Sequence, residues 1–429
     1  MQAHKIVCVC LGIILLGCRV PDPPVISQKN RGLIYDTAME AEIRSGTAPV
    51  IVTTAVSRYV DTLAEPVAIT EWTDKTCRWE VFVATNRGAF DDTDEADETI
   101  ATTIENRVLD VPRYGRADVL LPRKQRGTEP KMKQSPAPLR MLPFVGRRKS
   151  PDDEMTAAAD ARELTETDFL HGINDQLTRS RQQDLLLFVH GFNVSFDAAI
   201  VRTAQIALDM PFNGAVVAYC WPSQCGVLNY EADEPINKAS VSPFTQFLKT
   251  MLAGVPKETR INIVVHSMGN RIVMEALHNL PAPRGGNSAN KSFANVVLCA
   301  PDVGRNDFLD WAPGVVAQSD RVTLYANSSD TALIASKSLH SEMRAGDAWV
   351  PLVVEGIETI DCSRIDLSLM GHSYYGSNTD VLSDLFMLIK EDHPASKRPH
   401  LTKKKSATGP YWQFAQSAPA ILCTWHFDE

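Results

Sequence analysis

One serine of this chain lies where a buried strand is expected to turn directly into a helix. The β-branched run 261–265 predicts a buried strand, and from Met268 to Leu280 apolar residues recur at helical spacing. Ser267 lies at the corner between them. On such a sharp turn the hydroxyl stands clear of the sheet, and the helix N-terminus behind it offers N–H groups and a positive dipole end to an oxyanion. This placement predicts that Ser267 is a nucleophile.

The pattern around this serine departs in one position from the usual Gly-x-Ser-x-Gly. Gly269 occupies the last position, where a small residue lets strand and helix approach each other closely. The first position holds Val265, whose bulk opposes a tight turn. An alternative interpretation is a strand followed by a helix that Ser267 only caps, because serine is a favoured N-cap residue.

A serine hydroxyl needs a general base at neutral pH, and His372 is the histidine best placed to serve. Chains with such an elbow carry their histidine last, after the acid. His372 lies in the loop 370–376 between two glycines, which gives its imidazole freedom to swing toward Ser267. The alternative is an exposed loop histidine without a chemical role.

Two carboxylates compete to orient this histidine. Asp330 follows an expected strand and stands between Ser267 and His372, which is the order that such triads require. Asp302 follows the preceding expected strand and is the competitor. We predict the triad Ser267, Asp330 and His372, and we expect Asp302 to cap or orient the site.

An oxyanion hole is predicted from the loop His190-Gly-Phe-Asn193. In this arrangement the loop after an earlier strand donates one backbone N–H, and the residue after the nucleophile donates the other. The predicted donors are therefore Phe192 and Met268. Gly191 gives the backbone room, and His190 is expected to be structural. Residues 225–241 could form part of a cap over this site.

Strands and helices are expected to alternate through most of the chain. This alternation predicts an α/β fold with a mostly parallel central sheet and helices on both faces. Ligands of such sheets bind beyond the carboxyl ends of the strands, where the candidate residues fall. Strands are expected at 79–87, 117–122, 184–191, 214–222, 261–265, 293–299, 321–326 and, as the last, 357–362, and helices at 156–180, 195–209, 240–252, 268–280 and 379–390.

The first eighteen residues are typical of a bacterial lipoprotein signal. A short basic start precedes the apolar run 6–16, which is too short to span a bilayer as a helix. Gly17 and Cys18 follow in register, which predicts cleavage after Gly17 and lipidation of Cys18. The alternative is an ordinary signal with an incidental cysteine. We expect a protein of the bacterial cell envelope, lipid-anchored to a membrane on the periplasmic or outer-membrane face.

Charge and composition exclude several classes of protein. The 429 residues are 44% hydrophobic and 22% charged, as in ordinary globular proteins. A net charge of −9 argues against non-specific binding of nucleic acid. No Cys/His cluster has the spacing of zinc ligands, so we expect no metal and no cofactor. The sequence leaves the oligomeric state open.

An ordered set of motifs in this chain resembles a known family. The set resembles the alpha/beta-hydrolase family that was catalogued as a domain of unknown function and is often labelled an esterase/lipase superfamily. The resemblance implies the hydrolase fold and the triad proposed above, but no substrate. The motifs are Val81–Arg87, Phe188–Asn193, Trp221–Ser223, Tyr230, His266–Asn270, Ala300–Asp302, Ser329–Asp330 with Ala332–Leu333, and Gly371–Tyr374.

This resemblance divides the chain into expected segments. A signal peptide covers 1–17 and an N-terminal extension 18–77. The alpha/beta-hydrolase domain covers 78–390, with a charged insertion at about 91–150, and a basic tail covers 391–429. The basic residues between 113 and 149, taken as part of a solvated loop, could alternatively face anionic lipid or a cell-wall polymer.

The residues and the resemblance together predict a membrane-anchored serine hydrolase that acts on small-molecule carboxylic esters through an acyl-enzyme. One alternative is a catalytically silent hydrolase-fold lipoprotein that binds or scaffolds in the envelope. Another is an acyltransferase, which would pass the acyl group to an acceptor other than water.

Overall fold

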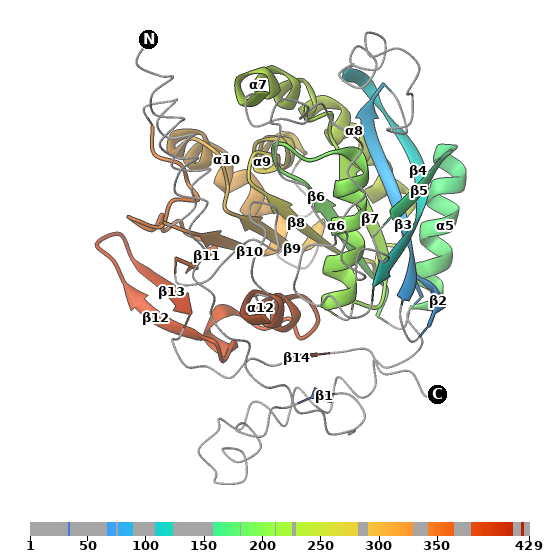
Figure 1. Ribbon diagram of the computed structural model, residues 1–429. Helices are drawn as coiled ribbons and strands as arrows, with labels where there is room; N and C mark the ends of the chain where they lie inside the picture. Colours follow the sequence, from blue (N-terminus) through green and yellow to red (C-terminus); the bar gives the residue numbers. More distant parts are fainter. Residues whose placement is uncertain are drawn as a thin grey trace, which may run out of the picture.

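The fold is a wide, mostly parallel sheet with helices on both faces, as the sequence predicts (Figure 1). The computed structural model describes residues 33–34, 67–73, 76–88, 108–122, 158–180, 182–210, 212–224, 229–281, 291–328, 342–363, 379–414 and 422–423. Among these residues, twelve strands form one sheet. Eleven of them lie in the order β12 (Leu401–Lys405), β13 (Pro410–Phe414), β11 (Ile357–Asp361), β10 (Ser319–Ala326), β9 (Phe293–Cys299), β8 (Arg260–His266), β6 (Asp184–Val189), β7 (Ala215–Cys220), β3 (Thr76–Arg87), β4 (Val108–Pro122) and β5 (Ala158–Leu164).

The strands from β13 to β3 are parallel, and the two margins of the sheet are antiparallel. β12 pairs antiparallel with β13, while β4, β5 and β2 (Ile69–Trp72) continue antiparallel from β3. The central strands β6 and β7 are buried along their whole length. This burial explains their continuous apolar sequences, because helices cover both faces of a parallel sheet. A separate short pair joins β1 (Leu33–Ile34) to β14 (Leu422–Cys423).

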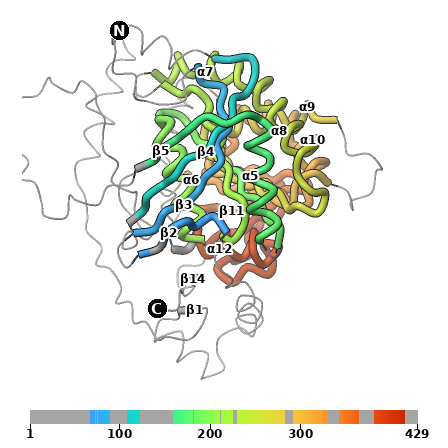
Figure 2. Tube along the Cα trace, turned by 90° about the vertical axis from the view of Figure 1, so that its right-hand side faces the viewer, coloured from blue at the N-terminus to red at the C-terminus, as the bar shows by residue number. Residues whose placement is uncertain are grey.

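Two apolar clusters hold helices against the two faces of the sheet. The helices α6 (Phe196–Asp209) and α12 (Thr379–Ile389) pack in one cluster. The other cluster contains side chains of α5 (Glu166–Arg179), α8 (Val241–Gly254), α9 (Gly269–Asn279) and α10 (Arg305–Gln318), which lie together on one side of the strands (Figure 2). This arrangement leaves the carboxyl ends of the strands as one edge on which a site can be built.

Several elements differ from the sequence-based expectation. The segment 158–164 was expected to begin a helix and is the strand β5, which pairs with β4. β4 begins at Val108 and so runs through the expected charged insertion, of which 91–107 and 123–150 lie outside the described residues. The helix α10 was not expected. Domain boundaries stay a prediction, but strands of this sheet occur from Ile69 to Phe414.

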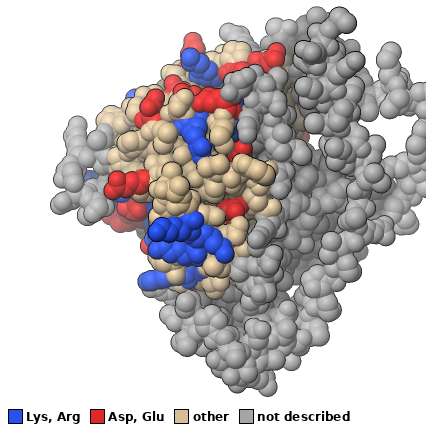
Figure 3. All heavy atoms as spheres, turned by 90° about the vertical axis from the view of Figure 1, so that its left-hand side faces the viewer, with Lys and Arg blue, Asp and Glu red and all other residues tan. Residues whose placement is uncertain are grey.

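The strands β12 and β13 of the C-terminal tail belong to the sheet, so the expectation that β11 is the last strand was wrong. Within it, the side chain of Arg398 is fully buried and donates to Asp384 Oδ2 (2.6 Å) and Glu358 Oε2 (2.8 Å). The outer strand β12 carries three exposed lysines, a common protection of a sheet edge against pairing. Figure 3 views the side of the molecule at the left of Figure 1, where β12 lies, and shows Lys and Arg in a compact group there.

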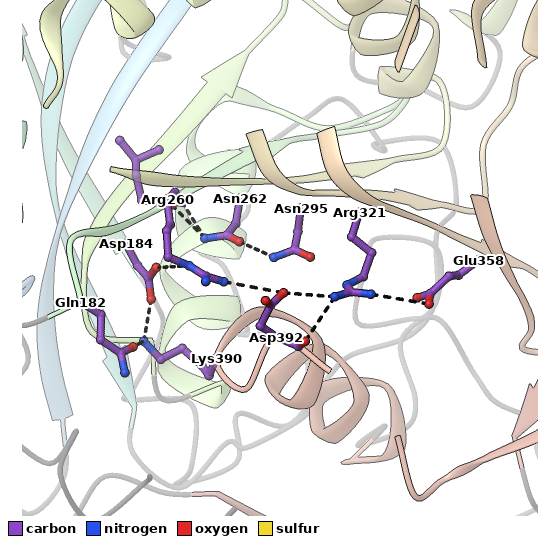
Figure 4. A network of polar contacts seen from close by, with 10 residues as sticks. Gln182, Asp184, Arg260, Asn262, Asn295, Arg321, Glu358, Lys390 and Asp392 are labelled. Atoms are coloured by element: carbon purple, nitrogen blue, oxygen red, sulfur yellow. Dashed lines mark hydrogen bonds and ion pairs between the residues drawn. The ribbon is translucent and has the colours of Figure 1, made fainter. Parts of the chain in front are cut away.

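A network of charged side chains joins the end of α12 to the amino ends of the strands (Figure 4). Lys390 Nζ lies 3.0 Å from Asp184 Oδ2, and these side chains are only 3% and 2% exposed. Arg260 Nε approaches the other oxygen of Asp184 at 3.3 Å. Arg321 Nη2 lies 3.3 Å from Asp392 Oδ1. The network therefore lies at the end of the sheet opposite to the candidate site.

We expect Lys390→Met to lower the free energy of unfolding by about 3 kcal/mol, because it leaves the buried carboxylate of Asp184 without its closest cation. Urea unfolding followed by circular dichroism measures the change. Lys404→Met is the matched control, since Lys404 is exposed on β12, and it should change the free energy of unfolding by less than about 0.5 kcal/mol. An equally small effect of Lys390→Met would contradict this account of the network.

Candidate active site

Ser267 lies in a strained turn between β8 and α9. Its φ angle is +50°, in the left-handed region that residues other than glycine rarely adopt. A Cβ atom at Gly269 would lie 2.4 Å from the carbonyl oxygen of His190, so only glycine fits where the helix start meets the end of β6. These two features are those of the predicted elbow. Val265 is fully buried and does not prevent the turn.

Hydrogen bonds hold this turn on both of its sides. The Ser267 N–H donates to Cys299 O (3.0 Å), at the end of the neighbouring strand β9. The Ser267 carbonyl accepts from the side chain of Asn270 (2.8 Å) and from the backbone N–H of Asp302 (3.2 Å). Every one of these partners is buried. The backbone around the serine is therefore fixed by its surroundings.

The loop after β6 lies directly against the serine. A Cβ atom at Gly191 would lie 2.8 Å from Ser267 Cβ, which shows how closely the two backbones approach. Within the part of the chain that the structure describes, the backbone N–H groups of Phe192 and Met268 donate to no acceptor. Asn193 has a φ of +58°, which asparagine tolerates better than most residues. The loop thus turns at Phe192 beside the elbow.

His190 is buried and packs flat on Trp221, with 5.3 Å between ring centroids and 7° between planes. Its ring nitrogens lie 2.8 Å from Gly191 O and 3.1 Å from Trp221 O. Burial, reinforced by the charge of Arg87, lowers the pKa of His190 to about 3, so the ring is neutral at pH 7. Because a neutral imidazole has one proton, it donates to one of these carbonyls only. His190 therefore supports the loop.

Asp302 has cationic partners on both carboxylate oxygens. Arg344 Nε lies 3.2 Å from Oδ1, and Arg271 Nη2 lies 3.0 Å from Oδ2. The hydroxyl of Tyr230 also donates to Oδ2. Although burial alone lowers the pKa of Arg271, the charge of Asp302 raises it above its ordinary value. Asp302 thus ties the loop after β9 to the elbow helix α9, on which Arg271 lies.

Three of the predicted site residues, Asp330, His372 and Cys18, lie outside the described residues. The described chain before Asp330 ends at Ser328, and the preceding residue, Asn327, donates its N–H to Gly346 O (2.8 Å). Gly346 in turn donates to Pro301 O (3.0 Å), beside Asp302. The structure therefore brings together Ser267 and both predicted oxyanion residues, while the triad stays a prediction.

A comparison with protein-family models matches residues 165–390 to the family described as "Alpha/beta hydrolase of unknown function (DUF900)". The match covers more than half of the 429 residues. The chain belongs to this hydrolase family. No curated protein matches it.

Two solved structures are similar to this alpha/beta hydrolase over much of their length. One is an inhibited esterase B from Lactobacillus rhamnosis, at 10% identity and a TM-score of 0.31, with 83% of this chain and 97% of the esterase covered. The other is phospholipase PlaB from Legionella pneumophila, at 10% identity and a TM-score of 0.23, with 54% of this chain and 67% of the phospholipase covered. Similarity at this level carries no argument about the activity of the present hydrolase.

Sequence analysis missed a helix beside the site of this alpha/beta hydrolase. The helix α7 (Tyr230–Ala239) lies in the segment expected to form part of a cap, and Pro235 inside it hides its helical character. Its polar residues Tyr230, Asp233, Glu234 and Asn237 recur at i, i+3, i+4 and i+7, which is the signal that could have revealed it. Arg271 lies on the helix expected after Ser267, but its contact with Asp302, like that of Arg344, could not be predicted without the fold.

The described residues of this hydrolase contain no group of three or more His, Cys, Asp or Glu side chains that could hold a metal ion. In the same ranges, no helix has the length and apolar character needed to cross a bilayer.

Proposed function

We propose that this member of the hydrolase family is a serine hydrolase that cleaves carboxylic esters through an acyl-enzyme. The observation that carries the proposal is the left-handed turn at Ser267, packed against the Gly191–Phe192 loop. A hydroxyl fixed above the end of a strand, next to backbone N–H groups that have no acceptor among the described residues, is suited to attack a carbonyl and to stabilise the resulting oxyanion.

Each proposed residue has a separate role in the reaction. Ser267 Oγ attacks the ester carbonyl carbon while its proton passes to the imidazole of His372. The N–H groups of Phe192 and Met268 bind the oxyanion that forms. His372 then protonates the leaving alcohol as the ester C–O bond breaks. A water molecule repeats the sequence on the acyl-enzyme and releases the acid. Asp330 orients His372 and stabilises its charged form.

Labelling by a fluorophosphonate tests the nucleophile. We expect the wild-type protein to form a covalent adduct at Ser267 and Ser267→Ala to form no adduct, because only the activated hydroxyl displaces fluoride. The thermal unfolding midpoint of Ser267→Ala should equal that of the wild type. Intact-mass spectrometry measures the adduct and peptide mapping locates it. A wild-type protein that forms no adduct would contradict the proposal and favour the alternative of a catalytically silent envelope protein.

Hydrolysis and acyl transfer are separated by product analysis. Incubation of wild type with p-nitrophenyl esters, with and without added alcohols or amines, distinguishes release of free acid from transfer to the acceptor. The p-nitrophenyl series also ranks acyl chain lengths, for which the described residues give no preference.

The two candidate acids predict different outcomes on substitution. We expect Asp330→Asn to lower the labelling rate by about 10³-fold or more at an unchanged unfolding midpoint, as loss of a triad carboxylate does. Asp302→Asn should instead lower the unfolding midpoint, because it leaves the charges of Arg271 and Arg344 poorly compensated. Folded Asp302→Asn should still label within about tenfold of wild type. The reverse pattern would make Asp302 the triad acid.

We also propose that the enzyme is anchored to a bacterial membrane through lipidated Cys18, facing the periplasm or the outer surface. The support is the register of the apolar run 6–16, Gly17 and Cys18 in the sequence. Full-length protein expressed in a bacterial host should fractionate with membranes and carry acyl chains by mass spectrometry. Cys18→Ser should lose the acyl chains and the membrane association, because one thioether-linked cysteine is the attachment point. Unchanged fractionation of Cys18→Ser would refute the anchor.

A further inference from the structure

The helix α7 presents its polar side chains toward the candidate site. Tyr230, Asp233, Glu234 and Asn237 share one face of the helix, because residues three, four and seven apart lie above one another. Asp233 and Asn237 are fully buried, whereas Glu231 and Lys238 at the margin of this face are exposed. A buried polar face on a short surface helix is costly unless every member has a partner. The partners of these four side chains lie in the elbow helix, the oxyanion loop, the loop after β9 and, for Asp233, the loop after β7.

Asn237 contacts the elbow itself. Its side-chain Nδ2 donates to the carbonyl oxygen of Met268 (3.2 Å), and both residues are buried. The Met268 carbonyl and the Met268 N–H lie in the two peptide groups that flank one Cα atom. Met268 has helical φ and ψ angles of −62° and −24°, so a bond that fixes its carbonyl also fixes the direction of its N–H while these angles are kept.

Asp233 holds the oxyanion loop through one intermediate side chain. Its Oδ2 accepts from Ser223 Oγ (2.7 Å), and Ser223 Oγ accepts from the backbone N–H of Asn193 (2.9 Å). Its Oδ1 accepts from the backbone N–H of Gln224 (2.8 Å). Asn193 directly follows Phe192, so this chain of bonds orients the peptide plane next to the second candidate donor. Both carboxylate oxygens of Asp233 are in use, and an amide in its place could accept only one of the two bonds.

Tyr230 and Glu234 join the same loop to the elbow helix. The ring of Tyr230 packs edge-on against Phe192, with 5.3 Å between centroids. Arg271 Nη2 donates to the Tyr230 hydroxyl (2.8 Å), and Arg271 Nη1 donates to Glu234 Oε1 (2.7 Å). Arg271 lies four residues after Ser267 on α9. One side chain of α7 therefore touches the oxyanion loop with its ring and the elbow helix with its hydroxyl.

We infer that the polar face of α7 is a positioning element that sets the backbone N–H groups of Phe192 and Met268 relative to Ser267. The inference rests on the proposed serine-hydrolase function and deepens it, since none of these side chains reacts. The helix contacts both halves of the oxyanion hole, which come from segments about 75 residues apart in the chain. Removing an α7 contact should therefore misplace a donor without removing it.

The test compares three substitutions on the buried face of α7, the inner variants, with two matched substitutions at exposed positions of the same helix, the outer variants. The inner variants are Asn237→Leu, Asp233→Asn and Tyr230→Phe, and the controls are Lys238→Leu and Glu231→Gln. The readout is the second-order rate constant of fluorophosphonate labelling, which needs no natural substrate, and for any p-nitrophenyl ester that wild type cleaves, kcat and KM separately.

Each inner variant should lower the labelling rate and kcat about tenfold or more, less than the 10²–10³-fold that loss of a donor costs. KM should stay near the wild-type value, because ground-state binding does not use the oxyanion hole. The outer variants should label within about twofold of wild type.

Three outcomes decide the inference. Inner variants that label as fast as wild type would overturn it and leave the serine hydrolase standing. A wild type that does not label would instead refute the proposed function. If Asn237→Leu does not fold, Tyr230→Phe decides, because this substitution removes a single oxygen atom and keeps the ring against Phe192. A fall in the kcat of Tyr230→Phe at unchanged KM supports the positioning role. A fall only in its unfolding midpoint overturns the inference.

Discussion

The left-handed backbone at Ser267 is the constraint on which the rest of the site depends. A residue other than glycine in this conformation costs on the order of 1–3 kcal/mol and persists only when its surroundings enforce it. The next strand ends in the same way, with Ala300 at a φ of +43°. Each of these residues donates its N–H to the end of the following strand, Ser267 to Cys299 O and Ala300 to Tyr325 O (2.8 Å). The ends of β8, β9 and β10 are thus tied together one after another.

Buried charges lie at both ends of the parallel strands, and the apolar layers lie between them. At the amino ends, Asp184 is held by Lys390, and beside α12 Arg398 is held by Asp384. At the carboxyl ends, Asp302 is held by two arginines. Breaking such a pair is costly because a buried charge is left alone, so these groups act as fixed points more than as sources of net stability. The fixed points at the amino ends bind α12 and the tail to the sheet, and Asp302 binds the elbow.

Sequence patterns predicted the elements in which one periodicity persists over enough residues. The mostly apolar runs of β6, β7, β8 and β9 were found because strands buried on both faces carry few polar residues. The buried exceptions Asn262 and Asn295 lie side by side on β8 and β9 and share a hydrogen bond (2.8 Å). The pattern failed where tertiary contacts override propensity. β5 has three alanines among its seven residues and would suit a helix, but β4 offers it an edge with which to pair. Three of the five residues of β12 are lysines, because this strand lies at the margin of the sheet, so no apolar signal marks it.

The residues of the candidate site also divide into those that local sequence predicts and those that only the fold brings together. Ser267, Met268, Gly269 and Gly191 were predictable, because a strand-to-helix corner and a glycine loop demand particular residue types locally. The partners of Asp302 were not, because Arg271, Arg344 and Tyr230 come from three separate elements and meet it only in the fold. The role of α7 was hidden by Pro235, which usually ends a helix.

The surroundings of Asp302 help to decide whether Asp302 or Asp330 orients the proposed base, His372. A triad acid must keep an oxygen directed at the imidazole N–H, and its charge must act mainly on that ring. Asp302 directs one oxygen at Arg344 and shares the other between Arg271 and Tyr230. Two guanidinium groups already balance its charge, so little of its field would remain for an imidazolium. This occupancy favours Asp330 as the acid and leaves Asp302 to hold the turn from which Ser267 would react.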